Sequence, residues 1–154
     1  MIFKIIGSII VILSCSFIGM ILSRDCAKRP AQLRELQGSL HMLENQICYL
    51  CEVIIDAFEK ISRVGGTQTG IFFTRTIEIL REEKTISAAD AWELAVSQCI
   101  GRTSLNSEDR EILLAFGKLL GNTDVEGQIR NIRLTLEQLK LQEQKAETSR
   151  KKNE

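Results

Sequence analysis

The most strongly patterned part of the chain is its amino-terminal end, where apolar residues follow one another without a charge. The segment from Ile5 to Ser23 contains no charged residue. As a helix rising about 1.5 Å per residue it would extend for roughly 28 Å, close to the hydrocarbon thickness of a bilayer. The run is longer than the apolar region of a typical signal peptide, and no small-residue cleavage site precedes the basic stretch that follows. We therefore expect residues 1–24 to form an uncleaved transmembrane anchor.

Basic residues around this segment indicate the direction in which it crosses the membrane. Lys4 alone precedes it, whereas four basic residues follow it within a dozen positions: Arg24, Lys28, Arg29 and Arg34. Because positive charge is retained on the cytoplasmic side, the pattern predicts a cell-membrane protein with its N-terminus outside and its soluble domain in the cytoplasm. The small residues Cys15 and Gly19, four apart, leave open whether another membrane helix packs on the anchor.

After Pro30 the apolar residues adopt a helical spacing. Proline suits the first turn of a helix, so we expect Pro30 to separate or kink the membrane helix from the cytoplasmic one. One long helix with an apolar seam at alternating spacings of three and four is then predicted, formed by Leu33, Leu36, Leu40, Leu43, Ile47, Leu50, Ile54, Ala57 and Ile61. We favour packing of this seam against the chain's own later helices, because Val53, Ile55 and Phe58 widen it. The alternative is a coiled-coil homo-oligomer.

Caps and glycines divide the remaining sequence into four shorter helices. Gly65-Gly66 is expected to end the long helix, and the next helix runs from about Thr67 to Glu83. Ser87 and Ser107 are the predicted N-caps of the two helices that follow. The first of these two ends near residue 101.

The last two helices are expected to form an antiparallel hairpin. Leu119 lies on the predicted buried face of the first, Gly121 ends it, and Asp124 caps the second, which starts at about Val125. Beyond Leu141 no apolar stripe continues, so the end of the chain, residues 146–154, is predicted to be an exposed polar tail, helical or frayed. The fold class is therefore all-α, with a compact bundle of about five helices over residues 25–145.

Composition and charge argue against some classes of function, nucleic-acid binding first. The 20 Lys and Arg residues balance the 20 Asp and Glu residues, so no overall field attracts nucleic acid, and we expect no nucleic-acid partner. The five cysteines are odd in number and one lies in the apolar segment, which argues against a disulfide framework.

Few side chains in the sequence are suited to catalysis or to metal binding. His41 is the single histidine, and no Ser and Asp constellation accompanies it. Cys48 and Cys51 are three apart and would share one helix face, but a zinc site would need further ligands from a second such pair. No glycine-rich phosphate loop with lysine is present. We therefore predict no catalytic, cofactor-binding or metal-binding residue and no enzyme activity, with a metal or redox protein using Cys48 and Cys51 as the alternative.

A series of motifs distributed along nearly the whole chain carries a resemblance to a known family. They are the anchor ending in Arg24, Arg29-Pro30, residues 32–36, Leu43-Glu44, residues 47–49, Ser87 to Trp92, Arg110 to Leu113, Phe116-Gly117, Leu120 to Asp124, Gln128, and Ile132 to Leu136. With these the chain resembles the stage III sporulation protein AB family, a relative of the type II secretion F-like cytoplasmic domains.

The resemblance implies a platform of the export or feeding apparatus in the mother cell of a sporulating pair. It would dock a secretion-type ATPase, stage III sporulation protein AA, together with other membrane proteins of the apparatus. The chain departs from the family's pattern in two places. Tyr49 is usually followed by a helix-breaking Thr-Pro-Leu turn, which is Leu-Cys-Glu here. Members also usually carry a second, carboxy-terminal membrane span, and this chain stops at Glu154, where that span would begin.

The candidate structural or interaction residues are those of the predicted hairpin and its surroundings, namely Gly117, Gly121, Asp124, Gln128, Trp92 and Arg130. Gly117 would allow close helix packing, and Gln128 would form a hydrogen bond within the hairpin.

Overall fold

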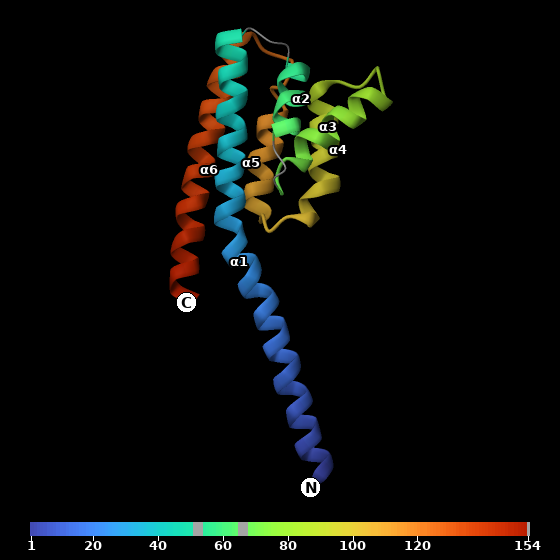
Figure 1. The fold of residues 1–154 in the computed structure, drawn as a ribbon, viewed down its shortest axis with the longest axis vertical. Helices are drawn as coiled ribbons and strands as arrows, with labels where there is room; N and C mark the ends of the chain where they lie inside the picture. Colours follow the sequence, from blue (N-terminus) through green and yellow to red (C-terminus); the bar gives the residue numbers. More distant parts are fainter. Residues whose placement is uncertain (51–53, 65–67, 154) are drawn as a thin grey trace.

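The structure is all-α, as predicted (Figure 1). The computed structural model describes the backbone of residues 1–50, 54–64 and 68–153, and the side chains of these residues except those at 2, 21–26, 49–50 and 153. In chain order the elements are α1 (Ile2–Leu50), α2 (Ile54–Val64), α3 (Ile71–Glu82), α4 (Ala88–Cys99), the 3-10 helix η1 (Ile100–Arg102), α5 (Ser107–Gly117) and α6 (Val125–Asn153).

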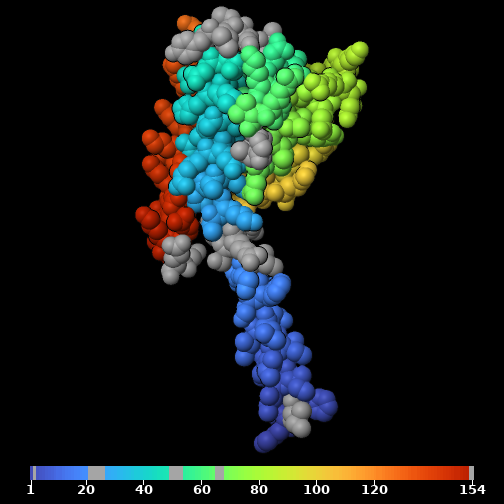
Figure 2. Space-filling model, in the orientation of Figure 1, coloured from blue at the N-terminus to red at the C-terminus, as the bar shows by residue number. Residues whose placement is uncertain are grey.

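Helix α1 continues from the apolar N-terminal segment into the bundle. Pro30 lies inside the helix and is buried, so it does not separate two helices. Figure 1 shows instead that the helix changes direction where it enters the bundle, which agrees with the predicted kink. Residues Phe3–Met20 are exposed and form a segment long and apolar enough to cross a membrane, and this segment projects from the body of the protein (Figure 2).

The long helix predicted through residues 33–61 is two helices. Helix α1 ends at Leu50, and α2 packs back against it, with Lys60 Nζ 3.3 Å from Gln46 Oε1. The prediction of one helix was wrong because Ala57 and Ile61 of α2 enter the same core as α1, so the apolar spacing continues across the break. Counting the second half of α1, the described residues thus form a six-helix bundle instead of about five helices.

The boundaries of the next helix also differ from the prediction. Helix α3 begins at Ile71, and Gly65, Gly66 and Thr67, the predicted stop and start, lie outside the described residues.

The apolar seam of α1 is covered by the chain's own helices. Its residues Leu33, Leu36, Leu40, Leu43 and Ile47 are at most 3% exposed. Helix α6 supplies the most extensive packing against α1 and places Ile132, Leu136 and Leu139 in the shared core. Because the described part of the seam is buried within one chain, the intramolecular interpretation is confirmed over a coiled-coil partner.

The end of α6 is helical, which is one of the two forms predicted for it, but it is not exposed throughout. Ala146 is 3% exposed and Gln142 is 7% exposed. Arg34 of α1 holds this part of α6 through Glu143, at 2.6 Å, and Glu147. The prediction relied on an apolar stripe, whereas this part of the interface consists mainly of polar contacts.

Capping residues set the starts of the shorter helices. Ser87 caps α4 as predicted, since its Oγ accepts the Asp90 N–H at 3.1 Å. The cap of α5 is Asn106 and not Ser107. Asn106 Oδ1 accepts the Asp109 N–H and Asp109 Oδ2 accepts the Asn106 N–H, each at 3.0 Å, which forms a capping box. Ser107 is the first residue of the helix itself.

Candidate interaction site

The side chains with reactive chemistry lie apart from one another. His41 is largely exposed, and its Nδ1 is 3.8 Å from Glu44 Oε2. Cys48 is exposed, while Cys51 lies outside the described residues, so the structure does not test the predicted pairing of these two thiols. Burial raises the pKa of the Cys99 thiol, which favours its neutral form. Within residues 1–50, 54–64 and 68–153, no group of three His, Cys, Asp or Glu side chains is placed to hold a metal ion.

Five of the six predicted interaction residues lie in the hairpin of α5 and α6, and three of them, Gly121, Asp124 and Gln128, shape its turn. Gly121 has a φ of +75°, the left-handed conformation that glycine adopts without strain. Asp124 caps α6, its Oδ1 accepting the backbone N–H three residues on at 2.8 Å. Gln128 is 4% exposed, and its Nε2 donates to the Leu119 carbonyl at 2.7 Å. The predicted stop, cap and hairpin hydrogen bond are therefore present, and together they fix the shape of the turn.

Trp92 of α4 packs against this hairpin at Gly117. A Cβ on Gly117 would lie 2.2 Å from Trp92 Cδ1, so only glycine allows this approach, as its predicted packing role requires. The indole N–H donates to the Leu113 carbonyl at 2.7 Å, and three phenylalanine rings lie with their centroids within 5.6 Å of the indole. Trp92 is fully buried. It therefore supports the hairpin from the core and does not itself present a surface to a partner.

The turn of the hairpin carries exposed apolar side chains. Leu119 is 41% exposed, which contradicts its predicted burial, and Val125 is 51% exposed. The residues between them from Gly121 to Asp124 are also exposed. We name Leu119, Gly121–Asp124 and Val125 the distal tip. Arg130 lies about one turn beyond it, exposed and 4.0 Å from Glu126.

The distal tip lies at the end of the bundle farthest from the projecting segment. Figure 1 shows the connection between α5 and α6 at this end, opposite to the N-terminus of α1. The ion pair between Arg133 and Glu44, at 2.6 Å, likewise places the first half of α6 beside the last turns of α1. The tip is therefore the part of the hairpin most remote from the apolar segment.

A buried ion pair at the opposite end of the bundle was missed by the sequence analysis. Asp109 is fully buried and accepts two hydrogen bonds from Arg29, from Nε at 2.8 Å and from Nη2 at 2.9 Å. Arg29 Nη2 also donates to Gln142 Oε1 at 2.9 Å. These contacts join α1, α5 and α6 just beyond the apolar segment. The signal in the sequence was only the capping-box spacing of Asn106 and Asp109, which does not identify the arginine.

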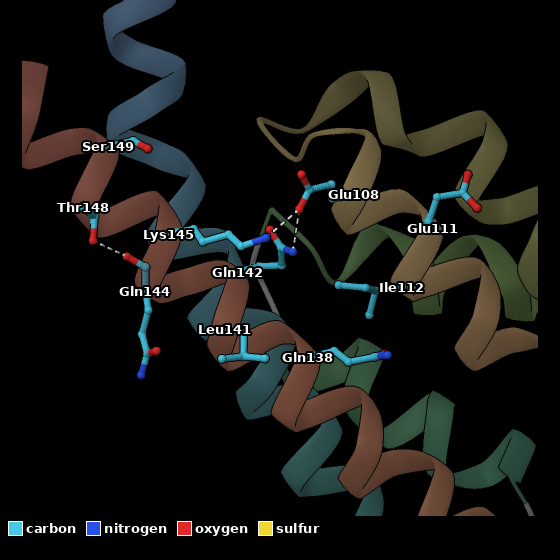
Figure 3. A pocket seen from close by; sticks show the side chains of 10 residues that line it. All are labelled: Glu108, Glu111, Ile112, Gln138, Leu141, Gln142, Gln144, Lys145, Thr148 and Ser149. Atoms are coloured by element: carbon cyan, nitrogen blue, oxygen red, sulfur yellow. Dashed lines mark hydrogen bonds and ion pairs between the residues drawn. The ribbon is translucent and has the colours of Figure 1, made fainter.

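A groove of about 880 Å³ lies beside this ion pair, between α5 and the second half of α6 (Figure 3). Apolar, charged and amide side chains line it, namely Glu108, Glu111, Ile112, Gln138, Leu141, Gln142, Gln144, Lys145, Thr148 and Ser149. Figure 3 shows Gln142 and Lys145 directed at Glu108, whose Oε2 accepts from them at 2.8 and 3.1 Å. The hydrogen bond from Gln142, followed by that from Lys145, lowers the pKa of Glu108.

Comparisons with known proteins agree on one family. The sequence model of stage III sporulation protein AB matches residues 4–154. A curated relative, stage III sporulation protein AB of Bacillus subtilis (strain 168), is 28% identical over 151 residues, covering 98% of this chain and 88% of the relative. A solved structure of a stage III sporulation protein AB superposes with a TM-score of 0.73 at 29% identity, covering 80% of this chain and 97% of that one.

Proposed function

Because the chain belongs to the stage III sporulation protein AB family, we propose that it is a membrane-anchored, non-enzymatic platform of a sporulation export apparatus. In this proposal α1 holds the bundle on the cytoplasmic face of the mother-cell membrane. The bundle docks a secretion-type ATPase, by family analogy stage III sporulation protein AA, and contacts other membrane proteins of the apparatus.

The observation that carries the proposal is the continuity of α1. Its first part is apolar and exposed over Phe3–Met20, and its second part is a core helix of the bundle, with Leu33 and Leu36 fully buried. One rigid element thus belongs to both a membrane segment and a protein core, as a platform requires. The basic residues Lys28, Arg29 and Arg34, which follow the segment, support a cytoplasmic bundle.

The distal tip is the surface that we assign to the ATPase. It lies at the end of the bundle remote from the apolar segment (Figure 1), where a soluble partner has free access. Its backbone is fixed by Gly121, Asp124 and Gln128, so binding would cost little ordering of the turn. Leu119 and Val125 supply apolar side chains of the kind that a partner can desolvate.

A pull-down of the full chain in detergent against the ATPase tests this function. Val125→Arg and Leu119→Arg should each weaken binding by on the order of tenfold or more, because a charge would enter the desolvated centre of the interface. Leu134→Arg is the matched control, since Leu134 is 56% exposed on α6 but lies outside the tip.

Several results would contradict the proposal. Full binding by both tip variants would move the docking surface elsewhere on the bundle. Absence of binding by the unaltered chain, with about one zinc ion per chain in the same sample, would favour the metal alternative at Cys48 and Cys51.

A further inference from the structure

A second pocket, of about 420 Å³, lies between α1, the start of α3 and the connection from α4 to α5. It is lined by Lys28, Gln32, Gln68, Ile71, Gly101, Arg102, Thr103 and Ser104. None of these residues is acidic, although the chain has as many acidic as basic residues. The groove of Figure 3, by contrast, is lined by Glu108 and Glu111. The described residues that line this pocket therefore carry a net positive charge, which the overall composition does not predict.

One wall of this pocket is held by a buried amide. Gln32 is 2% exposed. Its Nε2 donates to Gln68 Oε1 at 2.6 Å, and its Oε1 accepts the Ser104 N–H at 2.8 Å. Gln32 thus fixes the segment before α3 and the α4–α5 connection relative to α1, so the pocket is a built feature of the fold.

The two cations of the pocket are available for a ligand. Lys28 and Arg102 are both exposed, and in the part of the chain that the structure describes neither makes a hydrogen bond or an ion pair. A lysine and an arginine that line one pocket together with amide and hydroxyl groups suit a phosphate oxyanion, because charge-assisted hydrogen bonds to phosphate are strong.

The position of the pocket relative to a membrane identifies the source of the phosphate. Lys28 follows the last residue of the uncharged run, Ser23, by five positions, or about 8 Å along a helix. The headgroup layer extends roughly 5–8 Å beyond the hydrocarbon. Figure 1 shows the α4–α5 connection at the end of the bundle from which the N-terminal part of α1 projects.

We propose that this pocket binds the phosphate headgroup of an anionic phospholipid, with Lys28 and Arg102 as the contacting cations. The inference rests on the membrane anchoring in the proposed function, and it adds a ligand. A lipid held here would fix the bundle against the bilayer surface at a second point beside α1. Anionic lipid is the appropriate class, because the cytoplasmic leaflet attracts basic groups near the membrane surface.

Gly101 provides a sharp test. A Cβ at Gly101 meets no atom within 4 Å, so the backbone there accepts a side chain, and Gly101→Glu adds a carboxylate at the pocket lining. Gly38→Glu is the matched control, since Gly38 also has no atom within 4 Å of its added Cβ and lies outside the pocket. The charge-neutralising variants Lys28→Gln and Arg102→Gln test the cations themselves.

The full chain is inserted into nanodiscs of phosphatidylcholine, with or without phosphatidylglycerol, and its retained lipids are quantified by mass spectrometry after mild detergent extraction. We expect several-fold enrichment of phosphatidylglycerol. Gly101→Glu and each neutralising variant should reduce that enrichment on the order of fivefold, as expected for one charge near a lipid surface. Gly38→Glu should leave it unchanged. Hydrogen exchange at residues 100–106 should slow with phosphatidylglycerol in the unaltered chain.

The outcomes separate the pocket from the anchor. If the chain inserts but shows no preference for phosphatidylglycerol, or if Gly101→Glu leaves that preference unchanged, the pocket does not bind the lipid. The proposal that α1 anchors the chain in the membrane would still stand. Failure to insert into either nanodisc overturns the anchor and with it the placement of the pocket. Equal protection of residues 100–106 by inorganic phosphate alone would make the ligand a soluble anion and overturn the lipid assignment.

Discussion

The ion pair between Arg29 and Asp109 is predicted to be the most sensitive polar contact in the bundle. Asp109→Asn preserves the size of the side chain and an oxygen for the Asn106 N–H, but removes the charge that Arg29 contacts at 2.8 and 2.9 Å. Removing one partner of a buried pair costs roughly 3–5 kcal/mol. Because the Arg29 side chain is 15% exposed and can be partly rehydrated, we expect the lower end of this range, about 3 kcal/mol.

Trp92 makes this loss measurable. It is the single tryptophan of the chain and is fully buried, so its fluorescence reports unfolding of the bundle during urea titration of the full chain in detergent. With a slope of about 2 kcal/mol per molar urea, Asp109→Asn should lower the midpoint by about 1.5 M. Glu111→Gln is the control, because Glu111 is an exposed residue of the same helix, and its midpoint should change little.

A double variant tests the physical cause of the loss. Arg29→Met combined with Asp109→Leu removes both charges, and apolar replacement of a buried pair is often close to neutral. The lost hydrogen bond from the Asn106 N–H to the Asp109 carboxylate should then cost about 1 kcal/mol, less than the single variant. If the double variant is as unstable as Asp109→Asn, or if Asp109→Asn costs under about 1 kcal/mol, then loss of the charge contact between Arg29 and Asp109 is not what destabilises the bundle.

The same titration checks three further substitutions, and NMR checks a fourth. Gly117→Ala should destabilise the bundle by about 1–3 kcal/mol through overpacking against the indole, whereas Gly38→Ala, in open space on a helix, should stabilise it by about 0.5–1 kcal/mol; equal effects would contradict the packing argument. Asp124→Ala should cost about 1 kcal/mol through the lost cap, and an unchanged midpoint would count against that cap. The pKa of Glu108 should lie below its ordinary value and rise in Gln142→Ala; since the folded-state pKa is lowered, Glu108 stabilises the fold at neutral pH and this contribution is lost as the pH falls through that pKa. A Glu108 pKa insensitive to Gln142→Ala would contradict this cause.

Some of the helix stops and caps, which depend only on neighbouring residues, were predicted from the sequence. Gly121 was identified as a stop because a left-handed residue is needed there, and Ser87 and Asp124 as caps because their side chains satisfy N–H groups within three residues. The antiparallel hairpin was predicted because Gly121, which ends one helix, and Asp124, which caps the next, are only three positions apart. Each of these features depends on fewer than about five consecutive residues, so no knowledge of the rest of the fold was required.

The features that were missed depend on partners far away in the chain. The apolar spacing does not reveal the end of α1 at Leu50, because α1 and α2 contribute to one core. The apolar residues of the two helices therefore continue at the same helical spacing across the break. The packing of the last turns of α6 depends on Arg34, more than a hundred residues earlier. The roles of Arg29 and Asp109 in the pair likewise required the fold, since either residue alone also fits an exposed helix surface.

Because α1 is one unbroken helix, the rotation of the bundle about the helix axis is fixed relative to the apolar segment Phe3–Met20. A helix advances by about 100° and 1.5 Å per residue. One residue inserted in α1 between Met20 and Lys28 would therefore rotate the whole bundle by about a quarter-turn around the helix axis. Seven inserted residues would nearly restore the original rotation and would move the bundle about 10 Å along the axis. The number of residues between the apolar segment and the bundle therefore determines the direction in which the distal tip faces.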